Sequence, residues 1–223
     1  MINNPPFGTH IDHAAQKPGT WAGGTTRAIY AYPPESIGTP ANAQLWAGTA
    51  VIDRAAAYSF FPERTRIHMP IHGNGIRLHF QNPAEVVALS TFAQHCFDGA
   101  RPVQVELVDG AIVAFNLIVQ ADVAAAVHVL HVGSQELALE LDRLSAAHAH
   151  TASTASVAQI VYAVNGVVAL IIADQPAIRL HPADAFVFHR RAVADPPGVK
   201  VGLRGLEAHA EVVVATLVFD NHT

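Results

Sequence analysis

The stretch VQVELVDGAIVAFNLIV, residues 103–119, contains two apolar runs on either side of Asp109-Gly110. The first run alternates apolar and polar residues, and both are rich in the β-branched and aromatic residues that favour strands. An Asp-Gly dipeptide readily adopts the positive φ angles of a tight turn. The stretch therefore predicts two strands joined as a hairpin. Asn165-Gly166, between QIVYAV and VVALIIA, predicts a second hairpin.

The same pattern recurs along the chain, with turn residues about every 8 to 12 positions, as in sandwiches and barrels. Expected strands are 26–32, 45–52, 64–71, 75–80, 84–89, 102–108, 111–118, 125–132, 157–164, 167–173, 177–181, 184–189 and 209–219. Residues 134–150 fit either a helix or a strand, and residues 146–156 suit a loop. The sequence predicts an all-β chain with two successive halves, 1–120 and 121–223.

Composition excludes several classes of protein. Of the 223 residues, 51% are hydrophobic and 14% charged, which argues against disorder and coiled coil. The formal charge is −5 and the only lysines are Lys17 and Lys200, so a nucleic acid partner is not expected. The start MINNPPFGTH lacks the pattern of a signal peptide, and the apolar run 167–173 is too short to span a bilayer. We expect a cytoplasmic protein.

Fourteen histidines raise the question of a metal site. His148 and His150 would share a face of a strand, but the next carboxylate after them is Asp174, so a third ligand is missing. Two further pairs have unsuitable spacing, namely His68/His72 and His128/His131. The lone Cys96 cannot form an internal disulfide, and no nucleophile or phosphate-loop motif is present. The prediction is no metal, no cofactor and no catalytic residue.

Three stretches together resemble the HutD/Ves family of cupin-like proteins, which is linked to bacterial histidine utilisation. They are WAGGTTRAIY at 21–30, VIDRAAAYSFFPERTRIHMPIHGNGIRLHF at 51–80 and FDGARPVQVELVDGAIVAFNLIV at 97–119. YAVNGVVAL and IRLHPADAFVF in the second half are similar more loosely. The resemblance implies a cupin-like double barrel (bicupin) in a single chain. It also implies a small-molecule-binding or regulatory role without established catalysis, with formylated or imidazole-derived intermediates of histidine breakdown as candidate ligands.

Some family positions are kept and others are changed. Those that match are Thr26, Ser59, Arg66, Asp98, Asp109 and Asn116. Trp21, Ala28 and Thr65 stand where the family has asparagine, glutamate and aspartate. The resemblance thus implies a pocket that has lost three polar groups, and this member is expected to bind a ligand that differs from the family's usual one.

A strand over 64–71 would place Arg64, Arg66, His68 and His72 on one face, while the other face is apolar. A guanidinium suits a carboxylate or formyl oxygen, so we expect Arg66 to anchor an anion pocket. The predicted ligand-binding residues are Arg66, Thr26, Ser59, His68, Asn116 and Asp98. The alternative for this stretch is a solvated sheet face with a structural salt bridge.

Three functions remain open. The leading one is a non-enzymatic protein that binds a small anionic metabolite and regulates histidine or amino-acid catabolism. The second is a metal-independent isomerase or hydrolase acting on a small carboxylate, with His68 and Asp98 as the reacting pair. The third is a degenerate member that works through its surface. A small anionic metabolite is the expected partner, and a homodimer is an alternative to a monomer.

Overall fold

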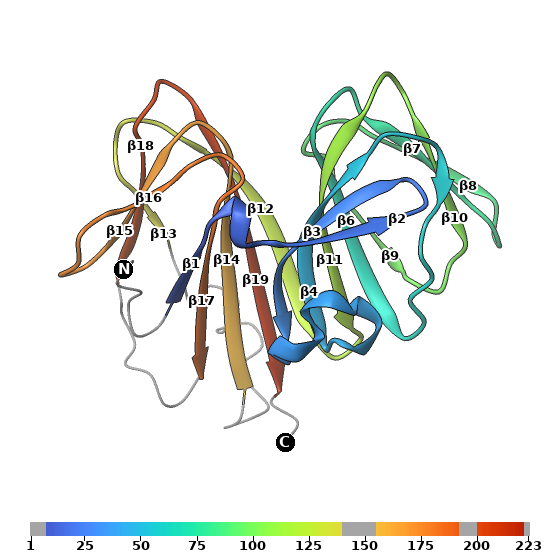
Figure 1. Ribbon diagram of the computed structural model, residues 1–223, viewed down its shortest axis with the longest axis horizontal. Helices are drawn as coiled ribbons and strands as arrows, with labels where there is room; N and C mark the ends of the chain where they lie inside the picture. Colours follow the sequence, from blue (N-terminus) through green and yellow to red (C-terminus); the bar gives the residue numbers. More distant parts are fainter. Residues whose placement is uncertain (1–7, 140–154, 192–199, 221–223) are drawn as a thin grey trace. The chain divides into compact units, whose positions relative to one another are not determined.

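The computed structural model describes residues 8–139, 155–191 and 200–220. These residues form β-strands and three short 3₁₀ turns, with no α-helix among them (Figure 1). The chain divides into two compact units, residues 16–121 and residues 1–15 with 122–223. Within the described part of the chain, no helix is long and apolar enough to cross a membrane.

The unit of residues 16–121 consists of two antiparallel sheets. The six-stranded sheet has the order β2-β3-β4-β11-β6-β9, and the four-stranded sheet has the order β5-β10-β7-β8. The strands of the larger sheet are β2 Lys17–Trp21, β3 Gly24–Tyr32, β4 Leu45–Ile52, β11 Ile112–Gln120, β6 Arg64–His72 and β9 His95–Asp98. Those of the smaller sheet are β5 Ala56–Ala57, β10 Val103–Leu107, β7 Ile76–Phe80 and β8 Glu85–Leu89. The turns η2 Pro34–Gly38 and η3 Pro40–Asn42 connect β3 to β4.

Alternation within the strands produces the core of this unit. Every second residue of β10 is buried at Val103 and Val105, and β7 contributes Ile76 and Leu78 in the same way. These side chains pack with residues of the larger sheet in one apolar cluster, made of Ala50, Ile52, Tyr58, Ile76, Leu78, Phe80, Leu89, Phe97, Val103, Val105, Ile112 and Ala114. The cluster contains residues from the C-terminal end of β4 and the N-terminal end of β11. The opposite ends of these two strands contribute Trp46 and Ile118 to a second, smaller cluster.

The other unit has the same two-sheet design. Its five-stranded sheet has the order β1-β17-β14-β19-β12, and its four-stranded sheet has the order β13-β18-β15-β16. The strands are β1 Gly8–Ile11, β17 Ala185–Arg191, β14 Ala155–Asn165, β19 Ala210–Asp220, β12 Ala124–Val132, β13 Leu137–Leu139, β18 Val201–Gly205, β15 Val168–Ile172 and β16 Ile178–Leu180. The turn η1 spans His13–Ala15. A core of aliphatic side chains forms around Phe186 and Phe188, whose rings lie 4.7 Å apart.

All thirteen strands predicted from the sequence occur, within a few residues of the expected ends. The five strands that the prediction missed are short, at most five residues each: β1, β2, β5, β9 and β18. The ambiguous segment 134–150 begins with β13, and its remainder lies outside the described residues, as does most of the expected loop 146–156. The all-β prediction is confirmed. The closed barrels are not, because each unit contains two separate sheets rather than one closed ladder.

Both predicted hairpins are wrong. Gly110 and Gly166 do adopt positive φ angles, 68° and 70°. However, β10 pairs with β5 and β7, whereas β11 pairs with β4 and β6. Likewise β14 pairs with β17 and β19, whereas β15 pairs with β16 and β18. Each turn therefore carries the chain from one sheet of its unit to the other.

The position of the N-terminal strand β1 differs from the prediction, which placed residues 1–120 in one half. β1 pairs antiparallel with β17, so that Thr9 lies opposite Val187. Residues 1–15 accordingly group with residues 122–223 and not with the half that follows them in the sequence. β1 has only four residues, of which two, Thr9 and Ile11, are β-branched. This explains why the sequence pattern did not reveal it.

Candidate functional site

A cavity of about 400 Å³ opens within the unit of residues 16–121. Its walls come from β2, β3, β4, β6 and β11, from the η2–η3 segment and from the loop that follows β5. The lining residues are Gly19, Thr20, Trp21, Thr26, Gly38, Thr39, Pro40, Ala41, Asn42, Trp46, Ala50, Ser59, Phe61, Arg66, Asn116 and Ile118. The volume falls within the range of about 300–1,000 Å³ that is usual for small-molecule sites.

Arg66 is the only charged residue in this lining. It is 8% exposed, and its guanidinium carbon lies 4.2 Å from the centre of the Tyr58 ring and 5.8 Å from that of Phe97. Its Nε and Nη2 donate to one acceptor, Asn116 Oδ1, at 3.3 and 3.1 Å. Among the described residues, no carboxylate forms an ion pair with it. Burial lowers the pKa of this guanidinium, which is the electrostatic signature of a desolvated cation.

Asn116 connects Arg66 to a buried chain of hydrogen bonds. Its Oδ1 also lies 2.7 Å from His68 Nδ1, and His68 Nε2 lies 3.1 Å from the Tyr58 hydroxyl. Because Asn116 Oδ1 can only accept, Nδ1 carries the proton, and Nε2 accepts from Tyr58. Burial, followed by the nearby Arg66, lowers the pKa of His68 to about 3, so the ring is neutral. Burial raises the pKa of the Tyr58 hydroxyl, which remains a donor.

Small residues on the larger sheet make room for the cavity. Ala28, Gly48 and Asn116 lie opposite one another on β3, β4 and β11. A side chain at Gly48 would meet the Trp46 indole at 2.5 Å, so glycine lets this ring lie over the sheet. Trp46 is held there because its Nε1 donates to the Ile37 carbonyl at 3.0 Å.

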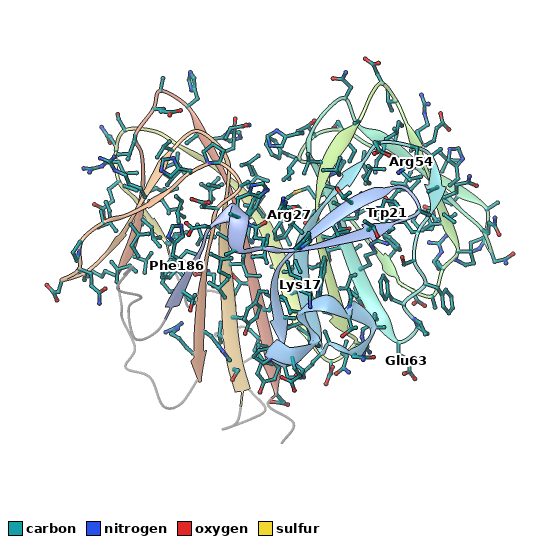
Figure 2. All side chains as sticks on the ribbon, viewed as in Figure 1. Lys17, Trp21, Arg27, Arg54, Glu63 and Phe186 are labelled. Atoms are coloured by element: carbon teal, nitrogen blue, oxygen red, sulfur yellow. The ribbon has the colours of Figure 1, made fainter. Side chains whose placement is uncertain are left out.

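Trp21 forms part of the opposite wall, at the end of the β2–β3 hairpin where Gly24 lies opposite it (Figure 2). Its ring packs edge-on against Tyr58, with 5.4 Å between the ring centres. A Cβ on Gly23 would clash with the indole, so this glycine in WAGG is needed for the ring's position. The Trp21 Nε1 donor is buried and has no hydrogen-bond partner among the described residues. The cavity therefore combines the Arg66 cation with the aromatic ring of Trp21.

Four of the six predicted ligand-binding residues line the cavity, namely Arg66, Thr26, Ser59 and Asn116. His68 lies behind the lining, fully buried between Tyr58 and Asn116. The structure does not bring Asp98 to the cavity. Its side chain is exposed, and Oδ1 accepts from the Ala100 amide at 2.8 Å to stabilise the turn after β9.

The geometry of β6 places neither His72 nor Thr65 on the same face as Arg66. His72 does not share its face, because the β6–β11 register shifts between Val113 and Ala114 and reverses the side-chain alternation. Thr65 is adjacent to Arg66 in β6 and therefore points to the opposite face. The family's aspartate at position 65 would therefore lie on the face away from the guanidinium, and the change to Thr65 is not a loss from this cavity.

The apolar walls and the η2–η3 segment were not predicted as parts of the site. Trp46 and Phe61 reach the cavity from β4 and from the loop before β6, and residues 38–42 close one side. The turn segment is fixed by the bonds Thr39 N to Ser36 O at 2.8 Å and Ala43 N to Pro40 O at 3.2 Å. The chain has two tryptophans, and both line the cavity. They were the feature of the sequence that could have indicated its apolar walls.

Similar solved structures share this architecture. One is a conserved protein, PA5104, from Pseudomonas aeruginosa, with a TM-score of 0.74 and 21% identity over 94% of this chain and 98% of that one. HutD from Pseudomonas fluorescens has a TM-score of 0.67 and 18% identity over the same shares. Oxalate decarboxylase from Lactobacillus farciminis has a TM-score of 0.62 and 6% identity over 95% and 88%. These likenesses show a cupin-like fold.

The comparison of sequences gives the family. No curated protein matches the chain. The HutD family model matches residues 12–202, which include all of the unit of residues 16–121, most of the other unit and every residue of the cavity lining. The resemblance seen in the sequence motifs is therefore confirmed, and the chain belongs to the HutD family.

Proposed function

We propose that this protein binds a small carboxylate in the cavity of residues 16–121 and acts by binding, as a regulator of histidine or amino-acid catabolism, rather than as an enzyme. One observation carries the proposal: Arg66 is a buried cation that lines a cavity and is paired with no carboxylate among the described residues.

The energetics favour an anionic guest. A buried charge is costly unless it is paired, and the chain supplies Arg66 only with the Asn116 amide oxygen and two aromatic rings. Nε and Nη2 are both directed to Asn116, which leaves donors of the guanidinium for a ligand. A carboxylate bound there would gain charge-assisted hydrogen bonds in a partly desolvated site.

The walls suggest the remainder of the ligand. Trp21, Trp46, Phe61 and Ile118 are apolar, so they suit a flat or aliphatic body. Thr26 and Ser59 add hydroxyl groups. Formylglutamate and urocanate, both intermediates of histidine breakdown, combine a carboxylate with such a body. The Pseudomonas fluorescens HutD structure is described for a formate condition and the Lactobacillus enzyme as a formate complex, which makes formate a suitable minimal probe.

The geometry does not support the enzymatic alternative built on His68 and Asp98. The β6–β9 register pairs Thr65 with Asp98 and His68 with His95, so His68 and Asp98 are on opposite faces. Both ring nitrogens of His68 already have partners, and its pKa is lowered to about 3. This imidazole is therefore a poor general base near neutral pH.

The test is carboxylate binding by calorimetry and thermal shift, with formate, formylglutamate and urocanate as probes. Arg66→Met keeps much of the side-chain bulk and should weaken binding roughly 30-fold or more, since losing one partner of a buried charge pair typically costs about 2–5 kcal/mol. Arg77→Met is the matched control, because Arg77 is exposed and paired with Glu106 at 2.8 Å. It should bind like the parent protein.

Failure of all three probes to stabilise the protein, or equal binding by the Arg66 and Arg77 variants, would refute the carboxylate site. The regulatory part is tested separately in a strain that lacks the gene. The parent gene should restore the normal growth response to histidine as sole nitrogen source, and the Arg66→Met gene should not. Turnover of any probe by the purified protein would instead favour an enzyme.

A further inference from the structure

Two aspartates and a histidine meet at one end of the β1–β17 ladder, in the unit that does not contain the carboxylate cavity. The ladder ends with Ile11 opposite Ala185, so the next residues, Asp12 and Asp184, face each other where it stops. His10 is two residues before Asp12 and so points to the same side. The ligand atoms of His10, Asp12 and Asp184 all lie within 4.8 Å of one another.

The distances do not describe ordinary hydrogen bonds. His10 Nε2 lies 3.6 Å from Asp12 Oδ1 and 3.5 Å from Asp184 Oδ2. Good N–H···O hydrogen bonds are about 2.7–3.2 Å long. Zinc bonds of about 2.0–2.2 Å in a tetrahedron place neighbouring ligand atoms about 3.3–3.6 Å apart. Both distances fit the edges of such a tetrahedron.

The charges also call for a cation. Like charges that face each other across strands destabilise a sheet. Among the described residues, no lysine or arginine lies within 4 Å of either carboxylate, and His10 is the one basic side chain beside them. A divalent ion between the two aspartates would remove the repulsion.

One ligand is fixed in advance and another remains accessible. Asp184 is 6% exposed, and its two oxygens accept from the His13 and His181 amides, each at 2.9 Å. These bonds orient the carboxylate as outer-shell bonds orient metal ligands. The Asp12 side chain is 55% exposed, so an ion can enter from solvent. We propose that His10, Asp12 and Asp184 bind a zinc ion whose fourth position is open to water, and that this ion fastens β1 to β17.

The sequence pattern does not reveal this group, because His10 and Asp184 are 174 positions apart and only neighbouring histidines within one strand are recognisable as a pair from spacing. The proposal is independent of the carboxylate site. The Arg66→Met protein should bind zinc like the parent.

The experiment uses full-length protein without a histidine tag, stripped of metal with a chelator. Zinc is titrated in competition with a chromophoric chelator, and cobalt is used as a spectroscopic probe of coordination. One equivalent should bind, raise the melting temperature and, as cobalt, give the intense visible bands of a tetrahedral site. Asp12→Asn should weaken zinc binding at least tenfold. This variant leaves both amide bonds to Asp184 intact.

The matched control is His79→Gln, which removes a half-buried histidine bonded to Glu106 at 2.7 Å, a true hydrogen-bond length. It should bind zinc like the parent protein. The His148→Gln/His150→Gln variant tests the other candidate pair in the sequence. If Asp12→Asn retains tight binding, if zinc is lost only with His148 and His150, or if no equivalent binds tightly, the proposal is overturned.

Discussion

Asn116 determines what Arg66 can do. One amide oxygen accepts from Arg66 Nε, Arg66 Nη2 and His68 Nδ1, so it holds the guanidinium against the Tyr58 ring without neutralising it. A carboxylate in this place would orient the guanidinium equally well but would cancel its charge. The choice of amide over acid at position 116 is therefore the feature that keeps the cation available to a ligand.

Asn116→Asp tests this with almost no change in volume. The aspartate should form an internal ion pair with Arg66 and repel a second carboxylate, so formate and urocanate should bind at least about tenfold more weakly. Near-UV circular dichroism should show that the fold is kept. Calorimetric affinities equal to those of the parent would mean that the ligand does not contact Arg66.

His68 should make this unit sensitive to acid. Its folded pKa, about 3, is below the ordinary value of 6.5, so the unfolded chain binds the additional proton between these values. The contribution of His68 to stability is therefore complete above about pH 6.5 and is lost as the pH falls towards 3. From pH 6 to pH 4 the loss from this one group is about 2–3 kcal/mol, at about 1.4 kcal/mol per pH unit where the proton difference is complete.

Denaturant unfolding at several pH values measures this dependence. Tryptophan fluorescence reports the unfolding of the unit that contains His68, because Trp21 and Trp46 are the only tryptophans of the chain and both are in residues 16–121. His68→Gln retains a donor for Asn116 and an acceptor for Tyr58 but does not titrate. Its stability should fall less steeply with acid, by about one proton. Parallel pH profiles for the two proteins would show that His68 already binds a proton in the folded state.

Residue patterns predicted the polar part of the site better than its walls. Arg66, Thr26, Ser59 and Asn116 were identified because they match family motifs, and the cavity contains all four. Asp98 matches a motif equally well, yet its carboxylate caps a turn. A motif position marks a residue with a role, and both ligand binding and turn formation are such roles. Only the strand register distinguishes a ligand-binding residue from a turn-forming one. The register of β9 could not be predicted, because this strand has only four residues.

At the scale of elements, the sequence predicted the long strands and the backbone of their turns but not the pairing. Alternation and a positive φ are local properties, so Asp109-Gly110 and Asn165-Gly166 were recognised as turns. Whether the chain returns beside the same strand or crosses to the facing sheet depends on which surface buries the next apolar run. The core clusters decide this, and they form between residues far apart in sequence.

The two turn glycines provide a comparison of backbone strain with and without a clash. A Cβ on Gly110 would meet nothing within 4 Å, whereas one on Gly166 would lie 2.5 Å from the His209 carbonyl oxygen. Gly110→Ala should therefore cost about 1–2 kcal/mol, the usual penalty of a left-handed alanine. Gly166→Ala should lower the free energy of unfolding by at least about 1 kcal/mol more than Gly110→Ala, because the backbone at His209 must move away from the new Cβ.

Denaturant unfolding measures both penalties, by tryptophan fluorescence for Gly110→Ala and by far-UV circular dichroism for Gly166→Ala. Equal penalties would mean that the 166 turn relaxes away from residue 209 without cost. A larger penalty at 110 would contradict the assignment of the open turn.

At the scale of the whole molecule, β1, the first strand among the described residues, belongs to the unit formed by residues 122–223. β1 covers the edge of β17 through four residue pairs, from Gly8 opposite Phe188 to Ile11 opposite Ala185. The approach is close, since a Cβ on Gly8 would clash with the Phe186 ring. An uncovered edge presents unpaired backbone groups, so this contact protects a strand that is otherwise exposed to further pairing.

Deletion of residues 1–12 should therefore destabilise residues 122–223 and leave residues 16–121 unchanged. The amides of β17 should exchange hydrogen faster, while those of β6 and β11 keep their protection, because these two strands are in the other unit. The tryptophan transition, which reports residues 16–121, should keep its midpoint as the transition seen by circular dichroism moves to lower denaturant. Added zinc should no longer stabilise the shortened protein, since His10 and Asp12 are lost with the strand. A shifted tryptophan transition with unchanged hydrogen exchange in β17 would contradict the β1–β17 pairing. It would show that the N-terminal residues pack on residues 16–121 instead.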